Sequence, residues 1–179
     1  MSTISNKEAT LMGLLYEKPR YAYEIELEIN NRSMDYWTEI SQSSIYKLLR
    51  KLEKRNMLKS EINLSEKNIA QKVYSLTSSG KAKFKEKIKE VISEWIPSIH
   101  PIDVGLANLY VLNKEDAIEC LKKYIKSLDE TIKGYGELEE FLISKKCTLG
   151  NLQLATRRIY ILKGEKKWLM TFLEEYKNE

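Results

Sequence analysis

The stretch 41–54 reads SQSSIYKLLRKLEK and predicts an amphipathic helix. Its serines can cap a first turn, so we expect the helix to begin among them and to run to about Asn56. Leucine and isoleucine recur at helical spacing and fall on one face: Ile45, Leu48, Leu49 and Leu52. The opposite face is polar and basic, with Tyr46 and Lys51 beside a row made of Ser43, Lys47, Arg50 and Lys54. One side of this helix therefore suits a protein core, and the other suits a negatively charged partner.

The positive charge of the chain is concentrated in this helix and the residues that follow it. Residues 47–59 contain six lysines and arginines against one acid, Glu53, whereas the whole chain has a net charge of only +4. From Pro101 to the end, 13 basic residues balance 13 acidic residues. A DNA major groove about 12 Å wide accepts one α-helix, and lysine and arginine contact its phosphates. We predict that 41–54 contains a DNA recognition helix.

Two further helices are predicted before this segment. Apolar periodicity indicates a first helix over 4–17, which ends because the residue before Pro19 disfavours helical backbone. The same spacing indicates a second helix over 21–31.

A β-hairpin is predicted directly after the recognition helix. Residues 57–62 and 70–76 have strand-like patterns and flank a polar stretch. The order of three helices and a hairpin is typical of a winged helix-turn-helix, in which the hairpin is the wing. We expect Lys67 and Lys72 of this wing to reach the DNA backbone.

The rest of the chain is predicted to be helical. A fourth helix at 78–96 completes an N-terminal domain at 1–96, and two prolines around His100 indicate a hinge at 97–113. Two long helices in 114–179 should fold back as an antiparallel hairpin that forms a dimerisation domain. The apolar seam residues expected at the dimer interface are Ile118, Leu121, Ile125, Leu128, Leu162, Leu169 and Leu173. The predicted fold is thus mostly α with one small β-hairpin.

Several motifs in the N-terminal domain also carry a family resemblance. They are Leu11-Met12-Gly13-Leu14-Leu15, Tyr23-Glu24, Ser44-Ile45-Tyr46, Leu52-Glu53, and Val73-Tyr74-Ser75-Leu76-Thr77 followed by Gly80. With these motifs, the chain resembles the PadR family of transcriptional regulators. The resemblance implies a dimeric winged-helix repressor with a helical C-terminal dimerisation domain. It also implies, as in some members, a response to phenolic acids or planar drugs.

The resemblance further implies which residues contact DNA. The implied recognition-helix contacts are Ser43, Ser44, Tyr46, Lys47 and Arg50, and Tyr23 of the second helix is implied to contact the DNA backbone. Two departures from the family pattern are visible. Ala22 replaces a glycine that is frequent before the tyrosine, and the wing lacks an arginine-rich tip.

Other classes of site find little support in the sequence. We expect no enzyme activity, no cofactor and no metal site, since the catalytic and metal-binding motifs are missing and Cys120 and Cys147 have no CxxC spacing. We expect no membrane association and a cytoplasmic location, because no apolar run is long enough to span a bilayer. Trp95, just before the hinge, is the candidate contact for a small aromatic effector.

The predicted function is sequence-specific binding of a palindromic double-stranded DNA operator by a homodimer. The predicted regulator is a repressor that a small aromatic effector releases. An alternative remains open at this point, namely a winged-helix module that uses the same basic face to bind an acidic protein.

Overall fold

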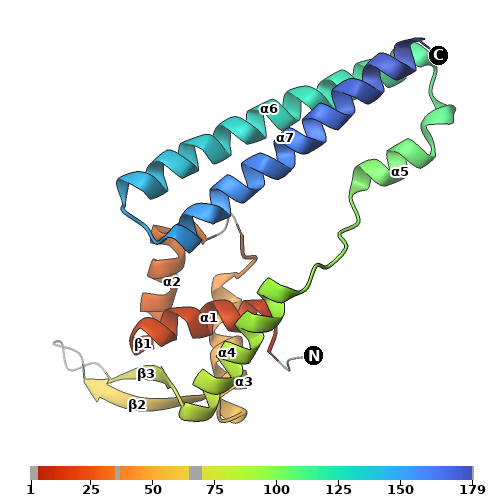
Figure 1. The fold of residues 1–179 in the computed structure, drawn as a ribbon. Helices are drawn as coiled ribbons and strands as arrows, with labels where there is room; N and C mark the ends of the chain where they lie inside the picture. Colours follow the sequence, from red (N-terminus) through yellow and green to blue (C-terminus); the bar gives the residue numbers. More distant parts are fainter. Residues whose placement is uncertain (1–3, 35–36, 65–69, 179) are drawn as a thin grey trace. The chain divides into compact units, whose positions relative to one another are not determined.

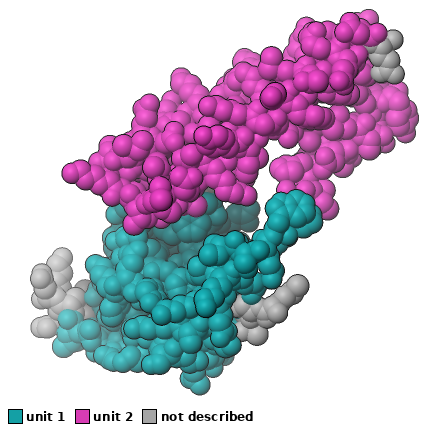
Figure 2. All heavy atoms as spheres, viewed as in Figure 1, with its two compact units in different colours: residues 1–97 teal, residues 98–179 magenta. Residues whose placement is uncertain are grey.

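The computed structural model describes residues 4–34, 37–64 and 70–178. The chain divides into two compact units, Met1–Pro97 and Ser98–Glu179, which Figure 2 distinguishes by colour. Lys67, predicted as a wing residue, lies outside the described residues. The predicted fold class is confirmed: a winged helix-turn-helix with a small antiparallel sheet is joined to a helical C-terminal region (Figure 1).

The first unit contains α-helices and a small three-stranded sheet. Its elements are α1 (Asn6–Glu17), β1 (Arg20–Tyr21), α2 (Ala22–Asn31), α3 (Gln42–Lys54), β2 (Leu58–Leu64), β3 (Ala70–Leu76) and α4 (Ser78–Ser93). The predicted hairpin is β2 and β3, which pair antiparallel with Ser60 opposite Tyr74. β1 adds a third strand on the other edge of β3, with Arg20 opposite Tyr74. The sequence analysis missed β1 because two residues are too few to show an alternating pattern.

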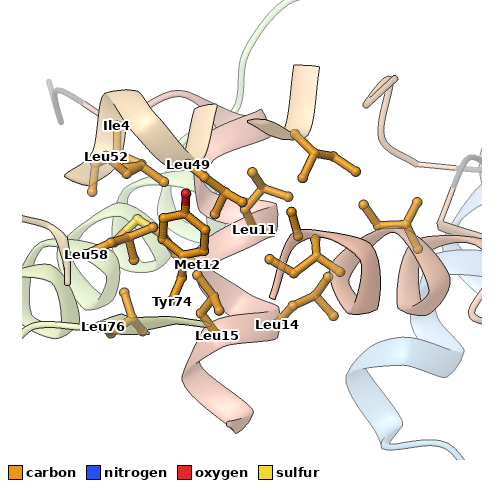
Figure 3. Packing of buried hydrophobic residues seen from close by; sticks show 14 of the residues in the cluster. Ile4, Leu11, Met12, Leu14, Leu15, Leu49, Leu52, Leu58, Tyr74 and Leu76 are labelled. Carbon is orange, nitrogen blue, oxygen red and sulfur yellow. The ribbon is translucent and has the colours of Figure 1, made fainter. Parts of the chain in front are cut away.

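The core of the first unit forms around α1. Leu11 of α1, Ile25 of α2, and Leu49 and Leu52 of α3 are all 0% exposed. Figure 3 shows Leu11 and Leu49 gathered with Tyr74 of β3 around α1. The predicted apolar face of α3 is therefore confirmed as the face that packs on the domain, and its basic face points away from this core.

A buried carboxylate joins α1 to the end of α3. Glu8 is 0% exposed, and its Oε2 accepts a hydrogen bond of 2.7 Å from the backbone N–H of Ser5, the N-cap residue of α1. Its Oε1 lies 3.0 Å from Lys51 Nζ and 3.0 Å from Arg55 Nη1. Burial raises the pKa of Glu8, but the Ser5 amide and the two cations outweigh burial and hold that pKa below the ordinary value of 4.5.

A second charged network fixes the corner between α1 and α2. Arg20 is 2% exposed, and it lies 2.9 Å from Glu17 Oε2 and 3.6 Å from Glu28 Oε1. Arg20 also donates a hydrogen bond to the carbonyl of Leu14 near the end of α1. Arg32 binds the same two carboxylates at 2.6 and 2.5 Å. These bonds hold the two helices at the turn that begins the helix-turn-helix.

The junction between the wing and α4 depends on one close backbone contact. Thr77 is the N-cap of α4, and its Oγ1 accepts a hydrogen bond of 2.9 Å from the Gly80 N–H. The Thr77 N–H donates to the Met57 carbonyl at 3.1 Å, which ties the end of β3 to the residue before β2. A Cβ on Gly80 would lie 2.0 Å from that carbonyl oxygen. The Thr-x-x-Gly motif is thus required by geometry at this junction.

The second unit is a long helical hairpin with a short helical lead. It contains α5 (Pro101–Ala107), the 3-10 helix η2 (Leu109–Val111), α6 (Lys114–Ser144) and α7 (Leu149–Asn178). α6 and α7 run antiparallel along most of their length (Figure 1). The predicted helical hairpin is therefore present. An ion pair of 2.5 Å between Lys166 and Asp129 links its two helices.

Two predicted segments differ in detail from the structure. α4 ends at Ser93 and not at Ile96, because Trp95 and Ile96 are 84% and 73% exposed and no packing holds a further turn. The predicted hinge at 97–113 contains α5 and η2. Pro101 occupies the first turn of α5, where its missing N–H costs nothing, so this proline begins a helix.

We expect Gly80→Ala to destabilise the first unit by about 1–3 kcal/mol, because the added methyl group forces the backbone away from the Met57 carbonyl. Urea denaturation followed by circular dichroism measures the loss. The control is Gly134→Ala in α6, where a Cβ meets no atom within 4 Å and the helix should gain stability. Equal stabilities for the two variants would contradict the assigned contact.

We expect Glu8→Gln to destabilise the protein at neutral pH by about 1–3 kcal/mol, since Lys51 and Arg55 lose their buried anion. The folded-state pKa of Glu8 is lowered, so its contribution is present above pH 4.5 and disappears as the pH falls through the folded pKa. Urea midpoints between neutral and acidic pH should therefore fall less steeply in Glu8→Gln than in the wild type.

Glu39→Gln is the matched control for this pH series. Glu39 is 95% exposed and lies 3.7 Å from Lys7, so its loss should leave the acid limb unchanged. An acid limb as steep in Glu8→Gln as in the wild type would show that Glu8 contributes nothing to it.

Candidate nucleic-acid interface

The start of α3 is held by its neighbours along the chain and by α2. Ser41 is the N-cap residue, and its Oγ lies 2.5 Å from Ser44 Oγ and 3.2 Å from Ser43 Oγ. The predicted serine cap is therefore present by position, although its hydroxyls bond to each other. The Gln42 side chain donates to Glu26 of α2 at 2.9 Å. These bonds leave Ser43 exposed at the first turn of α3 and Ser44 half-buried beside it.

Three cations on α3 form an exposed row. Lys47, Arg50 and Lys54 are exposed, and none of them has an ion-pair partner within 4–34, 37–64 and 70–178. They follow Ser43 along the same helix face, as the sequence predicts, opposite the buried Leu49. We call Lys47, Arg50 and Lys54 the cation row. Because these charges are not neutralised within the described structure, they are available to phosphate groups.

Two tyrosines lie on the helix-turn-helix as the sequence predicts. Tyr46 of α3 is 47% exposed, and Tyr23 of α2 is 54% exposed. Both side chains are thus accessible to a ligand, which the predicted DNA contacts require.

Lys51 differs from the cation row. It lies beside the row on α3, but its Nζ binds the buried Glu8 of α1, although 57% of its side chain is exposed. Sequence reasoning grouped Lys51 with the DNA contacts because Glu8 lies far away in the sequence, on α1. The structure shows that its charge already has a partner.

Lys72, the other lysine of the wing that was predicted to contact DNA, also has an ion-pair partner. Lys72 Nζ lies 2.8 Å from Glu53 Oε2 of α3 and 5.2 Å from the centre of the Tyr74 ring. The hydrogen bond from Lys72 lowers the pKa of Glu53, and the same bond raises the pKa of Lys72. Glu53, the acid that stands among the basic residues of α3, was not predicted to have a role.

The seam residues of the second unit pack between α6 and α7 of the same chain. Leu121, Leu128, Leu169 and Leu173 are 0–6% exposed and form one cluster. Ile118, Ile125 and Leu162 are half-buried at its edge. The four leucines thus have little surface left for a second subunit. The structure assigns these leucines to packing within the hairpin, and contact of the seam residues with a partner subunit stays a prediction.

The structure describes no alternative chemical centre. Within 4–34, 37–64 and 70–178, no cluster of histidine, cysteine, aspartate and glutamate could hold a metal ion. No helix in the described ranges is long and apolar enough to cross a membrane. Trp95, the predicted effector contact, is 84% exposed beyond the end of α4.

Comparison with known proteins agrees with this geometry. The model of the transcriptional regulator PadR-like family matches residues 11–86, which contain α3 and the wing. An uncharacterized protein of Lysinibacillus sphaericus is 32% identical over 102 residues, which are 57% of this chain and 89% of that protein.

Solved structures agree with the fold over nearly the whole chain. Bacillus subtilis PadR in complex with operator DNA has a TM-score of 0.78 at 17% identity and covers 96% of this chain and 99% of its own. The same protein in complex with p-coumaric acid has a TM-score of 0.74 at 17% identity, with coverage of 95% and 98%. The Vibrio cholerae virulence activator AphA has a TM-score of 0.69 at 15% identity, with coverage of 96% and 98%. Residues 11–86 of this chain form a domain of the transcriptional regulator PadR-like family.

Proposed function

We propose that this protein is a sequence-specific, DNA-binding transcriptional repressor that binds a palindromic operator as a homodimer. The observation that carries the proposal is the cation row, three exposed charges on the outer face of α3 that have no ion-pair partner among the described residues. A helix of this width enters the major groove, and unpaired lysine and arginine side chains gain favourable contacts with phosphates and base edges. The crystal structure of Bacillus subtilis PadR with operator DNA supports the same use of the fold.

Two copies of α3 would enter successive major grooves about 34 Å apart. One recognition helix contacts few base pairs, so a second copy is needed to distinguish an operator from other DNA. A bound dimer would then occlude a promoter. The sign of regulation that we propose, repression, follows from this occlusion.

The second subunit would cover apolar side chains that α7 leaves exposed. Ile161 and Trp168 are 45% and 43% exposed and lie seven residues apart, so they share one face of α7. Trp168 is stacked on Phe172 with 5.8 Å between the ring centres, which gives this face a rigid aromatic surface. Ile161 and Trp168 lie outside the cluster that joins α6 to α7, whereas Phe172 packs against the edge of that cluster. We therefore place the dimer contact on this face of α7.

A small aromatic molecule would release the repressor. The indole of Trp95 offers a flat, exposed apolar ring for such a molecule. Bacillus subtilis PadR, which shares the fold, has been crystallised with p-coumaric acid, an aromatic ligand. Release requires only that the effector binds one arrangement of the two recognition helices better than the other.

We expect Arg50→Ala to weaken binding by roughly 5- to 150-fold if Arg50 contacts a base, and Lys47→Ala to lower the salt dependence of binding by about one counterion. The measurement is fluorescence anisotropy over a salt series. Its probe is a duplex that the wild-type protein enriches from a random-sequence pool. Lys114→Ala is the control, because Lys114 belongs to the second unit, whose charge is balanced.

Equal losses in Lys47→Ala, Arg50→Ala and Lys114→Ala would contradict the groove assignment. Failure of the wild type to enrich any sequence would contradict specific DNA binding and favour the protein-binding alternative.

We expect the wild type to sediment at about twice the chain mass of 21.0 kDa. Ile161→Glu should shift it toward monomer, since a carboxylate on the apolar face of α7 would be buried without a partner. Lys163→Glu, another exposed position on α7, is the control and should remain dimeric. Analytical ultracentrifugation distinguishes these outcomes, and a dimer that Ile161→Glu leaves intact would place the contact elsewhere.

A further inference from the structure

Glu53 touches both strands of the wing with one carboxylate. Its Oε1 accepts a hydrogen bond of 2.5 Å from the Ser60 hydroxyl of β2. Its Oε2 accepts a hydrogen bond of 2.8 Å from Lys72 Nζ of β3. Glu53 itself lies in the last turn of α3, one residue before Lys54 of the cation row. A single side chain therefore connects the recognition helix to both strands of the hairpin.

The strand register makes this a connection at two separate points. Ser60 pairs with Tyr74, and Lys72 pairs with Ile62, so the two contacts of Glu53 lie two positions apart along the ladder. Tyr74 is 6% exposed and part of the core, and Lys72 lies over its ring. Lys72 is thus held between a core ring and the Glu53 carboxylate. Two attachments on different strands prevent the hairpin from pivoting about either one.

The same contacts remove Lys72 from the charges that are open to DNA. Its ammonium donates to a carboxylate of opposite charge, whereas the cation row has no such partner in the described residues. A phosphate could take Lys72 only by breaking the bond to Glu53. Breaking this bond would leave the Glu53 carboxylate without Lys72 and beside a DNA backbone of like charge, which is unfavourable.

We propose that Glu53 is a positioning residue for operator binding: through Ser60 and Lys72 it sets the angle of the wing against the recognition helix. We call the hydrogen bonds of Glu53 with Ser60 and Lys72 the strut, so Lys72 is part of the strut and not a phosphate contact. This inference rests on the proposed DNA-binding function. It explains why an acid stands at Glu53 among the basic residues 47–59, although a carboxylate beside the cation row by itself repels DNA.

The test compares the wild type, Glu53→Gln, Lys72→Met and the double variant on the enriched duplex over a salt series. If the strut sets the wing, each single variant binds about three- to tenfold more weakly. The double variant binds no more weakly than either single variant, because both remove the same connection. The slope of log K against log salt stays at the wild-type value, since no phosphate contact has been lost.

A direct phosphate contact by Lys72 predicts the opposite signs. Lys72→Met would then lower the salt slope by about 0.9, and Glu53→Gln would bind more tightly because it frees the lysine and removes a negative charge. Either result overturns the proposal, and so does wild-type affinity in both single variants. Thermal unfolding of each variant shows that the fold is retained, and Lys72→Met tests the strut independently if Glu53→Gln proves unstable.

Glu61→Gln is the matched control for the lost charge. Glu61 is a wing carboxylate that lies 3.2 Å from Lys59 of its own strand, and within the described residues it makes no hydrogen bond or ion pair with α3. Its loss removes the same charge but leaves the strut intact, so binding should not weaken. Arg50→Ala tests the proposed function separately: if Arg50→Ala binds as the wild type does, the DNA interface is wrong, whereas a failure confined to the Glu53 series overturns only the strut.

Discussion

The recognition helix depends on a carboxylate that has no exposed surface. A buried charge without partners would cost several kcal/mol, and the Ser5 amide, Lys51 and Arg55 together stabilise the ionised Glu8. The same side chain closes the first turn of α1 through Ser5. The capped first turn of α1 and the contact of α1 with the end of α3 therefore depend on the same side chain, Glu8. The packing of Leu49 and Leu52 then orients the helix whose end Glu8 has fixed.

The basic residues of the DNA-binding domain fall into two groups with different physical roles. Lys51 and Lys72 neutralise carboxylates of the domain itself, and their positions are set by those partners. The cation row has no such partners in the described residues, so its charge extends into the solvent. A count of lysines and arginines thus overstates the number of charges that are open to a polyanion.

The sequence predicted what depends on local periodicity. The helices, the hairpin and the two faces of α3 follow from spacings of three and four residues, and the buried Leu49 opposite the exposed Arg50 confirms this. Contacts between distant segments could not be predicted in this way. Arg55 and Glu8 are 47 positions apart, and Lys72 and Glu53 are 19 apart, so no local pattern joins them. β1 was too short to show a pattern, and Pro101 was taken as a breaker although its position begins a helix.

The bonds between Thr77 and Met57 close the base of the wing. The hairpin between these residues has its two ends already joined, so the flanking helices do not depend on its length. Doubling such a loop costs only about 0.6 kcal/mol in closure entropy. Insertions and deletions between β2 and β3 are therefore tolerated thermodynamically, and the length of the hairpin can change while α3 keeps its place.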